Sequence, residues 1–246
     1  PDSLALDVFA RGWVNAWGHA FDPWGRSLVT DGAGSEGINY GFPGAAYFTA
    51  VGTPRILHGM NPGSPKYCGL EFLGGRHLPD DAEGHLVTAD FRANRVCRYR
   101  LAEQGSGFTS EQLPDLIHSR RVTFRPIDMK MGPDGAVYIA DWYDSRLTHV
   151  DPRDNWHKQS GRIYRLKAKG AKPLKPFDLA KMTDEELVKV CDHDNKWFRQ
   201  QAVAEIADRR KKQHLDLLES MIEKDRPAAL EALWALYRIG HFQGKY

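Results

Sequence analysis

The densest run of polar and aromatic side chains in this sequence lies at residues 141–157. Aromatic rings stack on the C–H faces of sugars, and the acids and histidines between them can hydrogen-bond hydroxyl groups. This composition predicts a carbohydrate-binding face made by Trp142, Tyr143, His149, Trp156 and His157. An equally favoured interpretation is a long loop that ties down the last strand pair before Arg162.

The glycine-rich segment Asp-Gly-Ala-Gly-Ser-Glu-Gly-Ile-Asn at residues 31–39 is a second candidate site. Calcium takes about six to eight oxygen ligands, often from the backbone carbonyls of such loops. The segment lacks the ladder of aspartates typical of dedicated calcium sites, so an ordinary loop is the competing interpretation. No lysine follows the glycines, which excludes a phosphate loop of the P-loop type.

The cysteines and the charge balance exclude several classes of protein. Cys68, Cys97 and Cys191 form no CxxC pair, so no zinc ribbon, CxxCH haem site or dense disulfide framework is expected. The 34 Lys and Arg residues nearly balance 32 Asp and Glu, which disfavours nucleic-acid binding. No apolar run approaches the roughly 18 residues of a membrane span. The chain opens at Pro1, as expected for a processed chain or a piece of a longer one.

Two compositions divide the sequence. Residues 1–166 are rich in Gly, Trp and Arg, which is typical of a β domain. Residues 177–246 are rich in Ala, Leu, Lys and Glu, which is typical of helices. Residues 167–176 carry lysines and prolines without an acid, and we expect a solvated linker there.

The β portion contains one pattern three times: a turn ending in Gly25, Gly84 or Gly135, a short apolar strand, and an aspartate. Turn glycines supply the positive φ that tight hairpins need. The pattern recurs about every 50 to 60 residues, near the period of propeller blades. We therefore expect about three four-stranded blades of a β-propeller, with a further strand at residues 4–10. Because an open arc exposes sheet edges, a partner chain or missing blades would complete the ring.

The C-terminal portion predicts two pairs of helices. Thr183-Asp-Glu-Glu186 is a capping box that starts the first helix, and the second runs from about Asn195 to Arg210. The fourth ends at Gly240. The pairs repeat at a spacing similar to, though shorter than, that of HEAT repeats, and a plain helical bundle is the alternative. The fold class is therefore mainly β plus α: partial propeller blades followed by HEAT-like helical repeats.

Four segments carry a resemblance to a known family: residues 10–25, 66–72, 88–95 and 124–142. They resemble the propeller of the large membrane-bound dehydrogenase, or haem-binding-domain, proteins of planctomycetes and verrucomicrobia. The helical portion fits the same family, whose longer members continue from propeller to HEAT repeats to a cytochrome c-like module. The resemblance implies a periplasmic or otherwise extracytoplasmic location.

That propeller is in turn distantly similar to the glucose/sorbosone dehydrogenases, six-bladed enzymes that use pyrroloquinoline quinone (PQQ) and calcium. The resemblance therefore implies that the predicted blades are part of a six-bladed β-propeller. Where those enzymes place an Arg-Asn pair on the quinone, this sequence has Val14 and Asn15. Where their Gly-Pro carbonyls bind calcium, it has Gly32 and Ala33. Their cofactor lysine falls on Arg92.

Their Arg-x-Arg pattern before the last Pro-Asp-Gly falls on Arg125 and Ile127, so one arginine of the two is kept. The resemblance thus assigns Asn15, Arg92 and Arg125 to the cofactor. The family's histidine base lies in an earlier blade, so no catalytic residue is assigned here. Arg92 and Arg125 have a structural interpretation as well, since Arg–Asp pairs beside sheet turns are common.

Two functions follow as hypotheses. The first is part of a quinoprotein-like dehydrogenase that oxidises a sugar or another alcohol by hydride transfer to a quinone. The second is a non-catalytic module that binds glycans or protein partners, because Val14 and Ile127 replace two of the family's arginines.

Overall fold

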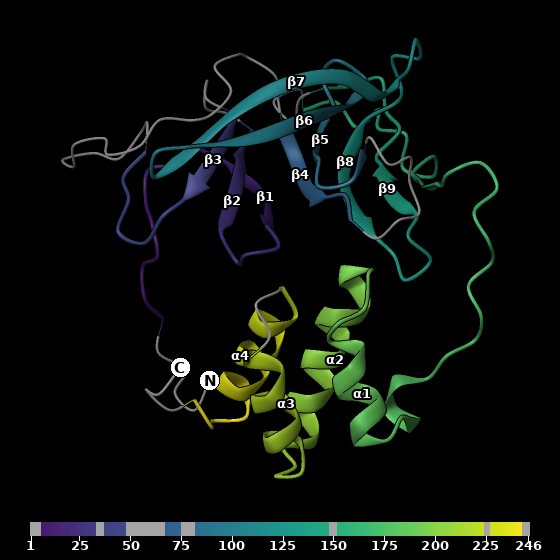
Figure 1. The fold of residues 1–246 in the computed structure, drawn as a ribbon. Coiled ribbons are helices and arrows are strands. Elements are labelled where there is room, and N and C mark those ends of the chain that lie inside the picture. Colours follow the sequence, from purple (N-terminus) through teal and green to yellow (C-terminus); the bar gives the residue numbers. More distant parts are fainter. Residues whose placement is uncertain are drawn as a thin grey trace. The chain divides into compact units, whose positions relative to one another are not determined.

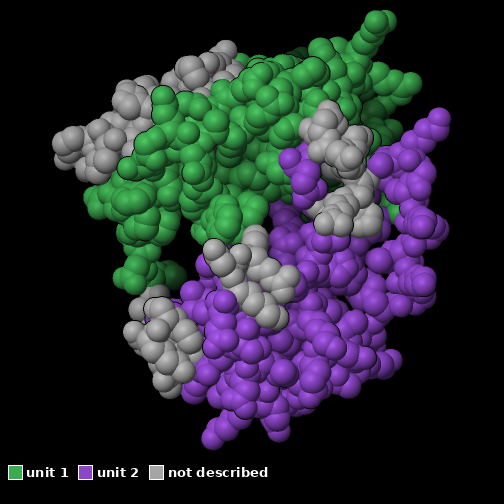
Figure 2. Space-filling view, viewed as in Figure 1, with its two compact units in different colours: residues 1–73, 84–130, 137–166 green, residues 74–83, 131–136, 167–246 purple. Residues whose placement is uncertain are grey.

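A computed structural model describes residues 6–32, 37–47, 67–74, 82–147, 152–223 and 227–242 of the chain. The chain divides into two compact units, coloured separately in Figure 2. Unit 1 comprises residues 1–73, 84–130 and 137–166, and unit 2 comprises residues 74–83, 131–136 and 167–246. Within the described residues every strand ends by Leu166 and every α-helix begins after it.

Three antiparallel sheets make up the strands (Figure 1). The first sheet contains β1 (Ala16–Phe21), β2 (Ser27–Asp31) and β3 (Ile38–Gly41) in that order. The second contains β4 (Tyr67–Phe72), β5 (Leu86–Asp90), β6 (Arg95–Gln104) and β7 (Gly107–His118). The third contains β8 (Pro126–Met131), β9 (Val137–Asp141) and β10 (Arg162–Leu166).

The predicted pattern of turn, strand and aspartate is confirmed at its turns and strands. Gly25, Gly84 and Gly135 have φ of +78°, +75° and +71°, and the apolar runs after them are β2, β5 and β9. The prediction of four strands per sheet is met by the second sheet alone among the described residues. The predicted strand at residues 4–10 is wrong over residues 6–10, which form no strand, and residues 4–5 lie outside the described residues.

The core of unit 1 lies between the first and second sheets. β2 is buried along its whole length, and in β1 the buried residues Gly18 and Ala20 alternate with exposed ones. β4 and β5 are buried along their whole length. The cluster consists of Ala20, Leu28, Ile38, Tyr67, Leu70, Phe72, Leu86, Cys97 and Tyr99.

Glycines allow the first strands of the three sheets to approach one another closely. β1 and β4 each carry a register irregularity, at residues 16–19 and 68–70. A Cβ on Gly18 would lie 2.5 Å from the backbone carbon of Gly69, and a Cβ on Gly69 would lie 2.7 Å from Cα of Asp128 in β8. The backbone of Gly69 also has φ of +63°, a left-handed conformation that favours glycine. Contact of β1 with β4, and of β4 with β8, therefore requires both glycines.

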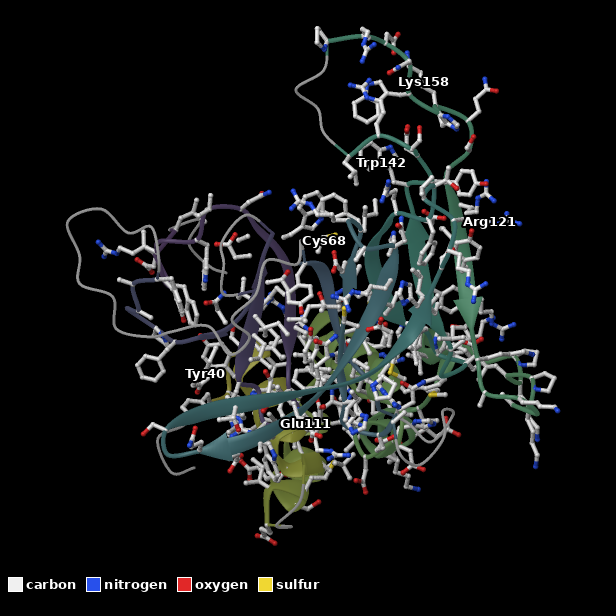
Figure 3. All side chains as sticks on the ribbon, turned by 90° about the horizontal axis from the view of Figure 1, so that it is seen from above. Tyr40, Cys68, Glu111, Arg121, Trp142 and Lys158 are labelled. Carbon is white, nitrogen blue, oxygen red and sulfur yellow. The ribbon has the colours of Figure 1, made fainter. Side chains whose placement is uncertain are left out.

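The hairpin of β6 and β7 reaches past its own sheet. Arg26, in the β1–β2 turn, pairs with Glu103 at 2.5 Å, and its guanidinium lies 4.5 Å from the ring centre of Phe108. The Phe108 ring also meets Tyr40 of β3 edge-on at 5.1 Å. Figure 3 shows Tyr40 and Glu111 of β7 at the same edge. These contacts fasten the second sheet to the first.

Unit 2 contains η2 (Leu179–Lys181), α1 (Asp184–Val190), α2 (Lys196–Arg209), α3 (His214–Ile222) and α4 (Pro227–Arg238). The predicted capping box of α1 is confirmed, and Asn195 caps α2. α1 contacts α2 and α3, and α4 contacts α2 and α3. The four predicted helices are present, and their assignment to HEAT-like repeats stays a prediction.

Asn195 also ties two segments of unit 2 together. Its side-chain oxygen accepts from the amide of Trp197, while Nδ2 donates to the carbonyls of Gly132 and Pro133 at 3.0 and 3.1 Å. The side chain is fully buried, so these bonds are made away from water.

Replacement of Gly69 by alanine tests the close approach of the strands. We expect Gly69→Ala to lower the free energy of unfolding by about 3 kcal/mol, since left-handed strain adds to a steric clash with Asp128. Gly84→Ala is the matched control, because Gly84 has a similar φ but nothing within 4 Å of an added Cβ. That control should cost about 1 kcal/mol. Urea unfolding measures both, and equal losses would contradict the packing argument.

Candidate functional site

A buried aspartate ends the second strand of each sheet, counted along the chain: Asp31, Asp90 and Asp141. The carboxylate of Asp31 accepts the backbone amides of Val14 and Asn15 at 2.8 and 3.1 Å. A carboxylate that accepts amides in this way fixes the direction of the chain that enters the neighbouring strand. The aspartate of the sequence pattern therefore positions Asn15, one of the predicted cofactor residues.

The aspartates that end β9 and β5 also accept backbone amides. Asp141 Oδ1 accepts the amides of Arg125 and Tyr143 at 2.7 and 2.8 Å. Asp90 accepts the amide of Ala93 at 3.2 Å and pairs with Nε of Arg95 at 3.1 Å. Equivalent strand ends of the three sheets thus hold the segments that contain the predicted site residues.

Within the first sheet, Asn15 and Gly32 lie together. The amide of Gly32 donates to the carbonyl of Asn15 at 3.0 Å. A Cβ on Gly32 would lie 3.0 Å from the carbonyl of Tyr67 and 3.6 Å from the indole of Trp17. The closest contact of an added side chain would therefore be with the Tyr67 backbone, whereas Trp17, which is 50% exposed, would meet it at an ordinary van der Waals distance.

Contacts from the first and third sheets converge on the β5–β6 turn of the second. The Trp17 ring lies 6.2 Å from the ring of Phe91. The guanidinium of Arg125 donates to the carbonyls of Phe91 and Arg92 at 2.8 and 3.4 Å. The three predicted cofactor residues consequently lie at one edge of the sheets, joined by a chain of contacts. Their binding of a cofactor stays a prediction.

Arg125 is a cross-link between backbone segments. Besides its bonds to the β5–β6 turn, its guanidinium donates to the carbonyls of Asp144 and Ser145, at 2.9 and 3.3 Å. The residue is 3% exposed. Burial lowers the pKa of Arg125, and the nearby carboxylates of Asp144 and Asp141 oppose that shift. Most N–H donors of the Arg125 guanidinium are hydrogen-bonded to these backbone carbonyls. Arg92, by contrast, is exposed.

The predicted carbohydrate-binding face is packed largely against itself. The rings of Trp142 and Trp156 stack at 5.0 Å, and the guanidinium of Arg146 lies 3.7 Å from the ring centre of Trp156. The ring of Tyr143, whose φ is +53°, is covered by Arg162 at 3.5 Å. Figure 3 shows Trp142 and Lys158 on the loop that follows β9. These contacts explain how the loop is held, and its binding of sugars stays a prediction.

Of the two histidines predicted to bind sugars, the structure describes His157. His157 is exposed, and its amide donates to Asp144 Oδ2 at 2.8 Å. His149 lies outside the described residues. Burial by itself would raise the pKa of Asp144, but the amides of Arg146 and His157, with the charges of both side chains, hold that pKa below its ordinary value.

The predicted calcium site is described only at Gly32, which is buried, because Ala33 lies outside the described residues. Asp31, its neighbour, uses its carboxylate on backbone amides. In the part of the chain that the structure describes, no group of three or more His, Cys, Asp or Glu side chains is placed to hold a metal ion. Calcium binding by the backbone of Gly32 and Ala33 stays a prediction.

Trp17 and Phe91 belong to this edge although they were not among the predicted site residues. The signal in the sequence is the dipeptide Trp17-Gly18, two residues after Asn15, because a glycine inside a strand often marks a bulge. A bulge re-aims the side chain beside it, and here β1 changes register between Ala16 and His19.

Comparison with known proteins finds similarity to a domain of unknown function, DUF7133, over residues 62–170. No curated protein matches the chain. The described part of the chain contains no helix that is long and apolar enough to cross a membrane.

Several solved structures are similar. A putative oxidoreductase (glucose dehydrogenase) from Thermus thermophilus is 20% identical, with a TM-score of 0.49 over 65% of this chain and 46% of that one. The PQQ-bound aldose sugar dehydrogenase of Streptomyces coelicolor is 17% identical, with a TM-score of 0.43 over 65% and 45%. The soluble aldose sugar dehydrogenase of Escherichia coli is 18% identical, with a TM-score of 0.40 over 56% and 44%. This chain spans less than half the length of each.

Removal of the Arg125 guanidinium tests its role as a cross-link. We expect Arg125→Met to lower the free energy of unfolding by about 3 kcal/mol, because buried carbonyls lose a charged donor. Arg125→Lys should recover part of that loss. Arg92→Met is the control and should change stability by less than about 0.5 kcal/mol, since Arg92 is exposed. Chemical unfolding compares the three variants. A loss no larger than that of the control would show that the cross-link is dispensable.

The lowered pKa of Asp144 predicts a pH dependence. A carboxyl whose pKa is lower in the folded state stabilises the fold above its ordinary pKa, 3.8, and loses that contribution as pH falls through the lowered value. The stability difference between wild type and Asp144→Asn should thus be largest at neutral pH and shrink in acid. Asp154→Asn, in an exposed pair with Lys158, should show no such trend. Unfolding midpoints across the pH range measure both.

Proposed function

We propose that this chain carries part of the cofactor-binding edge of a quinoprotein-type dehydrogenase that oxidises a sugar or another alcohol. The observation that supports the proposal is the meeting of segments 14–17, 31–32 and 91–92 at one edge of adjacent sheets. Two of the residues assigned by resemblance, Asn15 and Arg92, are exposed there.

The exposed groups fit part of such a cofactor. PQQ is a planar quinone with carboxylates, and it would supply hydride-accepting chemistry when bound. Arg92 offers a guanidinium to a carboxylate, and Asn15 offers an amide to a ring oxygen. Arg125 supports this edge by holding the carbonyls of residues 91 and 92. The base that takes the proton from the alcohol is assigned to no residue of this chain.

The wider assignments belong to the same proposal. Calcium would be bound in part through Gly32 and Ala33. A sugar or another alcohol would be the substrate, and further blades or a partner chain would complete a propeller ring. The proposed location is periplasmic or otherwise extracytoplasmic.

A non-catalytic module that binds glycans or protein partners is the second candidate. The observation that favours it is the occupation of the Arg125 guanidinium by backbone carbonyls, together with Val14 in place of a cation. These two features leave fewer cations for a quinone with several carboxylates.

Calorimetric titration of the chain with PQQ, with and without calcium, separates the candidates. If the chain carries a quinone-binding edge, PQQ should bind saturably, and Arg92→Gln should weaken that binding about tenfold. Tenfold is the usual effect of losing one charge-assisted hydrogen bond. Arg100→Gln is the matched control, because Arg100 is an exposed arginine paired with Glu111 on the β6–β7 hairpin. Absence of PQQ binding, with retention on a glycan array, would favour the second candidate.

A further inference from the structure

Trp17 is a large apolar side chain held in place while half of its surface faces solvent. Its ring centre lies 6.2 Å from that of Phe91 in the second sheet. A ring that already packs against a neighbour loses less conformational entropy when a ligand stacks on it.

The position of Trp17 follows from the bulge in β1. Residues 17 and 18 stand opposite the single residue Thr30, whose Oγ1 accepts the amide of Gly18 at 2.8 Å. Gly18 is pressed against the backbone of Gly69 in β4. The same close approach that joins the strands therefore directs the neighbouring indole toward Phe91.

The residue that follows Phe91 in the β5–β6 turn is Arg92, which is exposed. The carboxylates of Asp31 and Asp90 are buried and engaged by backbone amides, and Asp90 also by Arg95. An exposed aromatic ring that meets Phe91, together with the exposed arginine that follows Phe91 in the chain, suits a ligand that is both planar and anionic.

We infer that Trp17 and Arg92 form a two-part binding site for a planar ring that carries a carboxylate. The ring of the ligand stacks on the Trp17 indole, and its carboxylate pairs with Arg92. The inference deepens the proposed function and rests on it where the ligand is a quinone. Trp17 has not been assigned to any site by the family resemblance.

Calorimetry on the full chain tests the inference with three probes: PQQ, its trimethyl ester, and quinoline-2-carboxylate. Trp17→Ala should weaken PQQ and its ester alike, by about tenfold, and Trp17→Phe should retain most of the affinity. Arg92→Gln should weaken PQQ and quinoline-2-carboxylate about tenfold and leave the ester unchanged.

Trp24→Ala is the matched control. Trp24 is 54% exposed and lies in the turn at the other end of β1, roughly 20 Å along the strand from residue 17. This variant should bind all three probes as the wild type does.

The outcomes separate this inference from the proposed function. Binding of PQQ that is unchanged in Trp17→Ala overturns the inference and leaves the proposed function standing. If quinoline-2-carboxylate binds in a way that depends on Trp17 and Arg92 but PQQ does not bind, the result supports the inferred site and contradicts the proposal that its ligand is a quinone. Failure of all three probes overturns both.

Discussion

The close approach of β1, β4 and β8 is the constraint on which unit 1 depends. Gly18 lies against Gly69, and Gly69 against Asp128, at separations that leave no space for a Cβ. The strands could not pass at this distance with ordinary side chains, and the first, second and third sheets would separate. The candidate site follows from the same contact, because the bulge that brings Gly18 inward turns Trp17 toward Phe91.

Backbone groups, rather than pairs of charges, organise the edge where the site lies. Asp31 and Asp141 accept main-chain amides, and Arg125 donates to main-chain carbonyls. Buried charges are tolerated when hydrogen bonds satisfy them, and each of these bonds also fixes a turn. Arg125, one of the two arginines that the resemblance assigns to the cofactor, therefore has a role in the fold, whereas Arg92 is exposed.

Much of the local structure was predictable from residue types. The turn glycines, the strands after them and the Thr183–Glu186 capping box depend on neighbouring residues, and all are present. Residues 6–10 are largely apolar but form no strand, since a strand also needs a continuous ladder of hydrogen bonds with a partner. Trp17 was missed for a related reason: whether a strand tryptophan faces a core or solvent depends on the bulge beside it.

The sequence by itself determined the order of strands and helices, the positions of the tight turns and the kinds of side chain available for binding. Those properties depend on φ preferences, hydrophobic periodicity and capping, which act over a few residues. Only the tertiary structure decided that backbone carbonyls accept the hydrogen bonds of Arg125 while Arg92 is exposed, and that Trp17 lies beside Phe91. Partners some 30 to 75 positions away along the chain settle those states, and no local pattern specifies which distant carbonyl or ring will be within reach.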